Sequence, residues 1–115
     1  MNFELSEEHK MIQDAARDFA HNELFPGVIE RDESQTFPIE QIKKLGELGF
    51  MGMMVDPKYG GAGMDTISYV LAMEEISKVD ASCSVVMSVN NSLVCWGLET
   101  FGTEYQKEKY LTRLA

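Results

Sequence analysis

Proline, cysteine and clustered basic residues are all scarce in this 115-residue sequence, and each scarcity narrows the possible folds or functions. Three prolines leave room for long helices, because proline disrupts a helix interior. The two cysteines, Cys83 and Cys95, form no CxxC pair and lie among apolar residues, which predicts buried inert thiols and a reducing compartment. Ten basic and nineteen acidic residues give a net charge of −9, which argues against binding to nucleic acid or to an anionic membrane.

The sequence also lacks the local motifs of common catalytic sites. No P-loop, dinucleotide-binding GxGxxG or serine-nucleophile GxSxG pattern is present. His9 and His21 lie twelve residues apart with no carboxylates arranged to complete a metal site, so both are interpreted as surface histidines. The sequence therefore predicts no catalytic residue and no metal site within these 115 residues.

Long apolar runs and targeting signals are missing as well. No run reaches the ~18 consecutive apolar residues that a membrane span requires. The first eight residues, MNFELSEE, match neither a signal peptide nor an arginine-rich transit sequence. We expect a cytoplasmic, bacterial-like protein without a membrane segment.

Helical spacing of apolar residues dominates the sequence and predicts an all-α fold, a compact bundle of about five helices. Ser6, Asp65 or Thr66, Asp80 and Thr103 are candidate N-caps, and Pro38 is well placed to open a helix. The expected helices run from residue 6 to about 26, 38 to 49, 65 to 76, 80 to 96 and 103 onwards, with a short continuation over 27–33.

The fourth expected helix is the most unusual segment. No charged residue occurs from Ala81 to Trp96, a composition typical of a helix buried nearly all round, so we place it at the centre of the bundle. Asn90 and Asn91 interrupt its apolar surface. Two interpretations are open: a structural one, in which at least one asparagine bonds a neighbouring loop or helix end, and a functional one, in which one borders a ligand cavity.

Two further polar or irregular features have a structural and a functional interpretation. The segment Pro57–Gly63 contains three glycines in four positions and lacks the lysine and hydroxyl of a phosphate cradle, which favours a structural turn. Glu74 and Glu75 are adjacent, so they point about 100° apart on a helix and form no catalytic pair. A solvated face is favoured for both, and the alternative is that one faces inward and accepts hydrogen bonds.

Four segments, in this order and spacing, resemble the N-terminal domain of the acyl-CoA dehydrogenase family. They are Leu5–Glu8 with the helix end Phe19–Pro26, Leu48–Gly52 leading to Pro57–Gly63, Met73–Ser82, and Phe101–Lys107 continuing through Leu111. Within the family, Val86–Leu93 is most similar to the short-chain, butyryl-preferring branch.

The resemblance implies that residues 1–115 are one part of a three-part enzyme whose middle β domain and C-terminal helical domain are absent. Such an enzyme oxidises short-chain acyl-CoA to the 2,3-enoyl-CoA with FAD, passes electrons to an electron-transfer flavoprotein and forms a homotetramer. In most branches the glutamate base comes from the C-terminal domain. No residue here inherits that role or a flavin-binding role, so the fragment alone is expected to be inactive.

The same resemblance makes the fourth helix part of the acyl pocket wall. The candidates for substrate binding are Val85, Val86, Val89, Asn90 and Leu93, and residues 86, 89, 90 and 93 recur at three- and four-residue spacing. The alternative is that this face is ordinary core. For the chain as a whole, two other hypotheses stay open: a stand-alone helical interaction module, and a relative with altered flavin chemistry, such as an oxidase or a monooxygenase-like enzyme.

Overall fold

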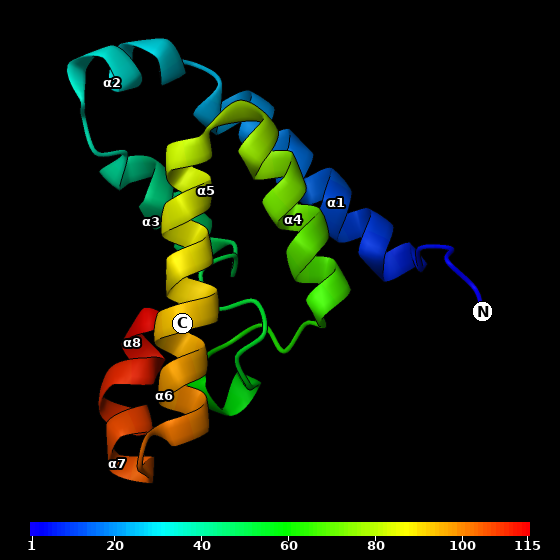
Figure 1. The fold of residues 1–115 in the computed structure, drawn as a ribbon, viewed down its shortest axis with the longest axis vertical. Coiled ribbons are helices and arrows are strands. Elements are labelled where there is room, and N and C mark those ends of the chain that lie inside the picture. Colours follow the sequence, from blue (N-terminus) through cyan, green and yellow to red (C-terminus); the bar gives the residue numbers. More distant parts are fainter.

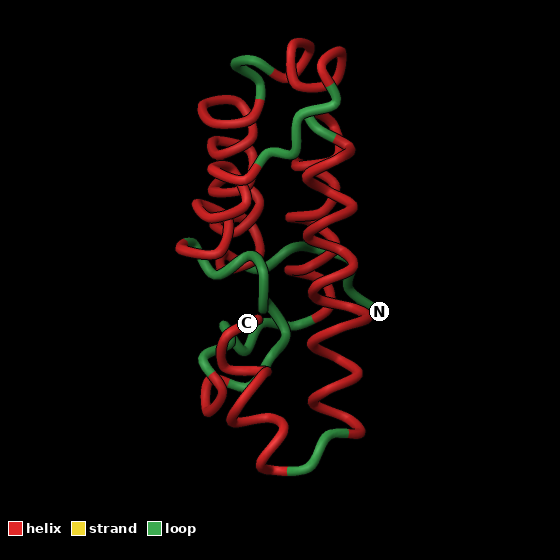
Figure 2. Tube along the Cα trace, turned by 90° about the vertical axis from the view of Figure 1, so that its left-hand side faces the viewer, coloured by secondary structure: helices red, strands yellow, loops and turns green.

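A computed structural model describes residues 1–115 and shows helices joined by loops, with no strand (Figures 1 and 2). The predicted all-α class is confirmed. Continuous helical segments form six rods, several of which include π-helical stretches. They are α1 (Glu7–Phe19) with η1 (Ala20–Leu24), α2 (Val28–Ser34), α3 (Ile39–Glu47), α4 (Thr66–Val79), α5 (Ala81–Ser88) with η3 (Val89–Cys95) and α6 (Trp96–Phe101), and α7 (Glu104–Gln106) with η4 (Lys107–Leu111) and α8 (Thr112–Leu114).

The helices begin where side-chain caps satisfy their free amides. The Ser6 hydroxyl accepts from the His9 N–H at 3.1 Å, and an Asp65 carboxylate oxygen accepts from the Ser68 N–H at 2.8 Å. Thr103, a predicted N-cap, forms a capping box with Gln106 at the start of α7. These local contacts explain why the sequence alone located most helix starts.

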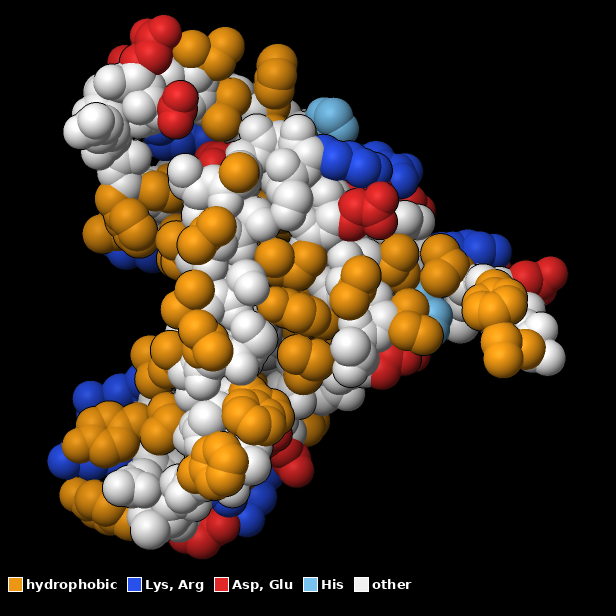
Figure 3. All heavy atoms as spheres, viewed as in Figure 1, with side chains coloured by type: hydrophobic (Ala, Val, Ile, Leu, Met, Phe, Trp, Pro, Cys, Tyr) orange, Lys and Arg blue, Asp and Glu red, His pale blue; other side chains and the backbone are white.

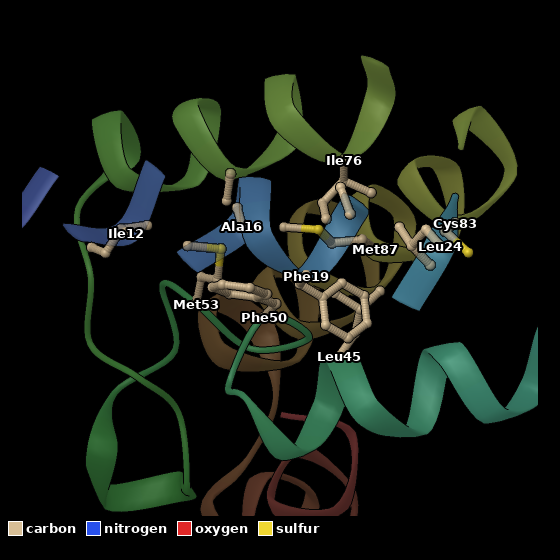
Figure 4. Close-up of a cluster of buried hydrophobic side chains, with 12 residues drawn as sticks. Ile12, Ala16, Phe19, Leu24, Leu45, Phe50, Met53, Ile76, Cys83 and Met87 are labelled. Carbon is tan, nitrogen blue, oxygen red and sulfur yellow. The ribbon is translucent and has the colours of Figure 1, made fainter. Parts of the chain in front are cut away.

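A large hydrophobic cluster holds α1, α3, α4 and α5 together. Figure 4 shows its side chains converging from those helices and from the loop after α3. Leu24, Leu45, Met53 and Ile76 are completely buried in it. The twelve members are Ile12, Ala16, Phe19, Ala20, Leu24, Leu45, Phe50, Met53, Ala72, Ile76, Cys83 and Met87.

A second, smaller cluster joins the other end of the molecule. Val55, Tyr59, Cys95 and Leu111 pack together where the short 3₁₀ turn η2 (Pro57–Tyr59) meets η3 and η4. Only the rod from α5 to α6 runs through both ends, as the ribbon in Figure 1 shows. We call the two ends the large lobe and the small lobe, each defined by its cluster.

The fourth expected helix corresponds to this long rod, and the prediction that it is buried nearly all round is wrong. Cys83, Met87 and Cys95 are buried on one side, whereas Val85 and Leu93 are 59% and 66% exposed on another. The molecule is only 19 Å across its shortest axis, against 42 and 40 Å for the others, so one side of the central rod has no helix over it (Figure 2).

Ala81–Phe101 is also long and apolar enough to cross a membrane, judged by length and composition alone. Only 28% of its most apolar window is buried inside the protein. A single such helix is weak evidence for a membrane span, because core helices of globular proteins pass the same test. The rod also carries two asparagines whose side chains bond protein backbone.

Helix α4 also leaves apolar side chains exposed. Leu71 and Ile76 are buried, whereas Ile67 and Val70 are 52% and 54% exposed. Spacing identified the helix correctly, while its exposed apolar side chains show that more than one face is apolar. The thin shape leaves that second face uncovered.

Candidate functional site on the long helix

Asn91 is the polar centre of the long rod and is almost completely buried. Its Oδ1 accepts from the Met53 N–H at 2.7 Å, and its Nδ2 donates to the Phe50 carbonyl at 2.8 Å. A third bond runs from Nδ2 to the Met87 carbonyl of the same rod at 2.9 Å. Both amide hydrogens and the carbonyl oxygen of the Asn91 side chain are therefore hydrogen-bonded, which offsets the cost of burying this polar group.

Asn90 is anchored beside it but reaches different partners. Its Nδ2 donates to the Met51 carbonyl and to the Leu114 carbonyl, each at 2.7 Å. The structural interpretation of the asparagines is thus confirmed for both residues. Asn90 also borders an open depression of about 350 Å³, lined by Gly46, Met51, Arg113, Leu114 and Ala115 as well.

The five residues predicted to line an acyl pocket fall into two groups. Val85, Val89 and Leu93 are 59%, 42% and 66% exposed, and form an apolar stripe on the open side of the rod. Val86 and Asn90 are half-buried, and the Asn90 amide group points to the loop and to the last helix. The expected common face of residues 86, 89, 90 and 93 is therefore split.

The π-helical stretch alters the spacing from Val89 onwards. From Val89 to Cys95 the helix has more residues per turn than an α-helix, so α-helical spacing no longer assigns faces correctly there. Exposure follows residues 85, 89 and 93 instead. Whether these side chains contact an acyl chain stays a prediction.

The exposed apolar stripe continues beyond the predicted residues. Trp96 and Phe101 are 53% and 77% exposed, and their rings pack edge to face with centroids 5.7 Å apart. Trp96 and Phe101, like Ile67 and Val70 of α4, were not predicted to be exposed. Figure 3 shows hydrophobic side chains gathering over α4 and the long rod. We call the exposed residues Ile67, Val70, Val85, Val89, Leu93, Val94, Trp96 and Phe101 the apolar face.

The glycine segment is a structural turn, as predicted. Gly63 has a φ of +62°, and a Cβ added at Gly61 would overlap the Val55 carbonyl. The turn folds back on the loop after α3, where the Gly63 N–H donates to the Val55 carbonyl at 2.9 Å and the Met64 N–H to the Met53 carbonyl at 2.7 Å. The turn thereby supports the same loop that the two asparagines hold.

Glu75 corrects the prediction of a solvated glutamate pair. Glu74 is exposed, but Glu75 is buried and forms ion pairs with Arg17 and Lys78, each at 3.1 Å. The hydrogen bond from Arg17 lowers the pKa of the Glu75 carboxyl, against the opposing effect of burial. The inward-facing alternative is therefore the correct one, and the group ties α1 to α4.

Asp80 joins α4 to α5 and has a structural role. Its carboxylate accepts from the Ser82 and Cys83 N–H groups and pairs with Arg31 at 3.2 Å. Burial alone would raise the pKa of Asp80, but the hydrogen bonds from the Cys83 N–H and thiol, followed by the pair with Arg31, bring it below its usual range.

The two thiols are inert, as predicted. Burial, followed by the neighbouring Asp80 carboxylate, raises the pKa of Cys83 to about 12. Burial raises that of Cys95 to about 11. Both thiols are therefore protonated at neutral pH.

His9 is more than a free surface histidine. Its Nε2 lies 2.8 Å from Asp65, while its Nδ1 accepts from the Ser6 N–H at 3.3 Å. The hydrogen bond from the Ser68 N–H, followed by the one with His9, lowers the pKa of Asp65 to about 2. No group of three or more His, Cys, Asp or Glu side chains gathers to form a metal site.

Comparison with known proteins places this geometry in one family. The family model of the acyl-CoA dehydrogenase N-terminal domain matches residues 6–115. The short-chain specific acyl-CoA dehydrogenase of Clostridium acetobutylicum is 44% identical over the whole chain, which spans 30% of that relative. Butyryl-CoA dehydrogenase from Megasphaera elsdenii superposes with a TM-score of 0.93 at 39% identity, over 99% of this chain and 30% of that one.

A third comparison concerns electron transfer. A chain from a structure of the electron transferring flavoprotein of Acidaminococcus fermentans is 45% identical, with a TM-score of 0.96, over 100% of this chain and 30% of that one. Fold and matches together define the class as an all-α N-terminal domain. The chain belongs to the acyl-CoA dehydrogenase family and spans about 30% of the length of the relatives named here.

Proposed function

We propose that this chain is the N-terminal domain of an FAD-dependent acyl-CoA dehydrogenase that converts short-chain acyl-CoA to the 2,3-enoyl-CoA. Agreement between the family match over residues 6–115 and the apolar face left uncovered on the long rod carries the proposal. A lone globular domain seldom exposes so many neighbouring hydrophobic side chains without a binding role. The whole enzyme would be a cytoplasmic homotetramer.

The chain's own contribution would be part of the wall of the acyl pocket. Val85, Val89 and Leu93 present branched side chains that can limit the depth of a cavity, at ~1–3 kcal/mol for each methylene that does or does not fit. These side chains suit an acyl chain and cannot bond the phosphates of FAD. The flavin and the glutamate base would be held by other parts of the enzyme, and FAD would accept the β-hydride there.

Electrons would leave the enzyme through an electron-transfer flavoprotein. The likeness to a chain from a structure of such a flavoprotein supports this partner. The net charge of −9 agrees with a role that involves neither nucleic acid nor an anionic surface. The fragment by itself would have no dehydrogenase activity.

The deciding experiment is the visible absorption spectrum of the full-length gene product before and after addition of butyryl-CoA and, separately, octanoyl-CoA. We expect an oxidised flavin spectrum that butyryl-CoA bleaches and octanoyl-CoA bleaches little. Bleaching by longer or branched chains only would keep the family and overturn the short-chain assignment. A full-length product without flavin would contradict the proposal and favour a helical interaction module.

A further inference from the structure

The loop after α3 is fixed to the long rod by two consecutive asparagine side chains. Three of its backbone groups, the Phe50 and Met51 carbonyls and the Met53 N–H, bond to Asn91 or Asn90 at 2.7–2.8 Å. Asn90 adds a bond to the Leu114 carbonyl of the last helix. Two neighbouring residues thus connect the rod to the loop and to a third helical segment.

This asparagine joint lies at the boundary between the two hydrophobic clusters. Met87, one turn before it, belongs to the large cluster, and Cys95, one turn after it, belongs to the small one. Between them the buried contacts of the rod are polar and directional. Hydrogen bonds fix orientation more strictly than apolar packing does. The rotation of this part of the rod is therefore determined by the asparagines.

The helix geometry agrees with that role. Adjacent side chains on an α-helix point about 100° apart, which makes it difficult for two of them to reach one loop. Because a π-helix has more residues per turn, the angle between neighbours is smaller, and the π-helical stretch Val89–Cys95 brings Asn90 and Asn91 toward the same loop. Val89 and Leu93 of the same stretch lie on the exposed side.

Close packing at the loop leaves it little freedom to follow a rotated rod. A Cβ added at Gly52 would come within 2.6 Å of the Ala115 backbone. The Ala62 N–H donates to the Gly52 carbonyl at 3.0 Å, which ties the loop to the glycine turn. The loop is therefore held in place, and the asparagines orient the rod relative to it.

We infer that Asn90 and Asn91 are positioning residues that determine the acyl-chain length accepted by the enzyme, because they fix the side of the π-helical stretch on which Val89 and Leu93 stand. The inference rests on the proposed function. Both Asn90 amide hydrogens are committed to the Met51 and Leu114 carbonyls. Asn90 therefore acts through the geometry of the helix, and the branched side chains make the contact with the acyl chain.

The test uses the full-length flavoenzyme carrying Asn91→Ala, with Ser92→Ala as the matched control. Ser92 is the next residue of the same stretch, and its hydroxyl bonds only the Ser88 carbonyl of its own rod. Steady-state kinetics with butyryl-, hexanoyl- and octanoyl-CoA give the chain-length profile. We expect Asn91→Ala to raise the ratio of octanoyl to butyryl kcat/KM about tenfold or more, mainly through KM. Ser92→Ala should leave this ratio within about twofold of the wild type.

A purely structural role would give a different result. In that case Asn91→Ala lowers the melting temperature and leaves the chain-length ratio unchanged, which overturns the inference. If Asn91→Ala does not yield folded flavoenzyme, Asn90→Ala decides, because the Asn90 side chain is only half-buried. We expect a smaller shift of the ratio in the same direction, and an unchanged ratio contradicts the inference. Failure of the proposed function is distinguishable, since no acyl-CoA would then bleach the wild-type enzyme.

Discussion

The two lobes of the molecule are stabilised in different ways. The large lobe buries twelve hydrophobic residues from four helices and the loop after α3, whereas the small lobe buries four. Hydrogen bonds partly compensate for the smaller hydrophobic cluster of the small lobe. The Asp56 N–H donates to Glu99 at 2.9 Å, and the Tyr59 hydroxyl donates to Glu104 at 2.7 Å. Because stability scales with buried apolar area, the small lobe is the weaker end.

This asymmetry bears on the long rod, which belongs to both lobes. Its α5 end contributes Cys83 and Met87 to the large cluster, while α6 has no buried residue. Local opening costs least where few apolar contacts are made. We therefore expect the small lobe to open first and the apolar face to be most mobile near Trp96.

Truncation of the large cluster should have the greatest effect. Leu45→Ala removes a completely buried side chain and should lower the free energy of unfolding by about 2–5 kcal/mol. Leu48→Ala, half-exposed at the end of the same helix, is the control, with an expected change within about 0.5 kcal/mol. Urea unfolding followed by circular dichroism measures both. Equal losses would show that the large cluster is not the main source of stability.

The same truncation in the small cluster should act locally. Leu111→Ala should cost about 2 kcal/mol and increase amide hydrogen exchange around Tyr59 and η4, with little change in α1 and α4. Leu114→Ala, which is partly exposed and keeps its backbone carbonyl, serves as the control. Uniform loss of protection across the chain would mean that the lobes unfold as one unit.

The polar links of the small lobe can be tested one at a time. Tyr59→Phe removes the hydroxyl that bonds Glu104 and keeps the buried ring beneath the Lys58 and Lys107 cations, so we expect a loss of about 1 kcal/mol. Tyr105→Phe, at an exposed ring, should change little. Thermal melts of both variants provide the measurement. A neutral Tyr59→Phe would show that packing alone sustains this lobe.

The smallest effect concerns acid stability in the large lobe. The pKa of Asp65 falls from its ordinary 3.8 to about 2 on folding, so its ionised form contributes stability above about pH 4 that is lost as pH falls toward 2. Asp65→Asn should therefore flatten the stability curve between these values. The change should be modest, because the carboxylate is half-exposed and screened by solvent.

Urea midpoints measured from pH 2 to pH 6 test this dependence. Asp18→Asn, an exposed aspartate of α1, alters the net charge equally and is the control. An unchanged slope in Asp65→Asn would mean that the bonds from Ser68 and His9 do not stabilise the ionised form. The comparison also shows down to which pH the contact between His9 of α1 and Asp65 at the start of α4 stabilises the fold.

The apolar face shows how far the site could be predicted. The uncharged run of branched apolar residues identified the helix that carries the apolar face, and Val85, Val89 and Leu93 proved to be exposed. Val86 and Asn90 were assigned to the same face by α-helical spacing. The π-helical stretch alters that spacing from Val89 onwards, whereas Val86 lies in α5 and is half-buried. No local signal marks that stretch, because the loop groups that bond its two asparagines lie 38 to 41 residues away in the sequence.

The sequence by itself determined the helical class, the capped helix starts at Ser6 and Thr103, and the glycine turn, because each depends on residues within one or two turns of one another. Only the tertiary structure decided which side of the long rod is covered, that Glu75 is buried against Arg17, and that the asparagines hold a loop. Those outcomes depend on which segments meet across a thin molecule. Such meetings are set by the packing of the whole chain, beyond the reach of local spacing.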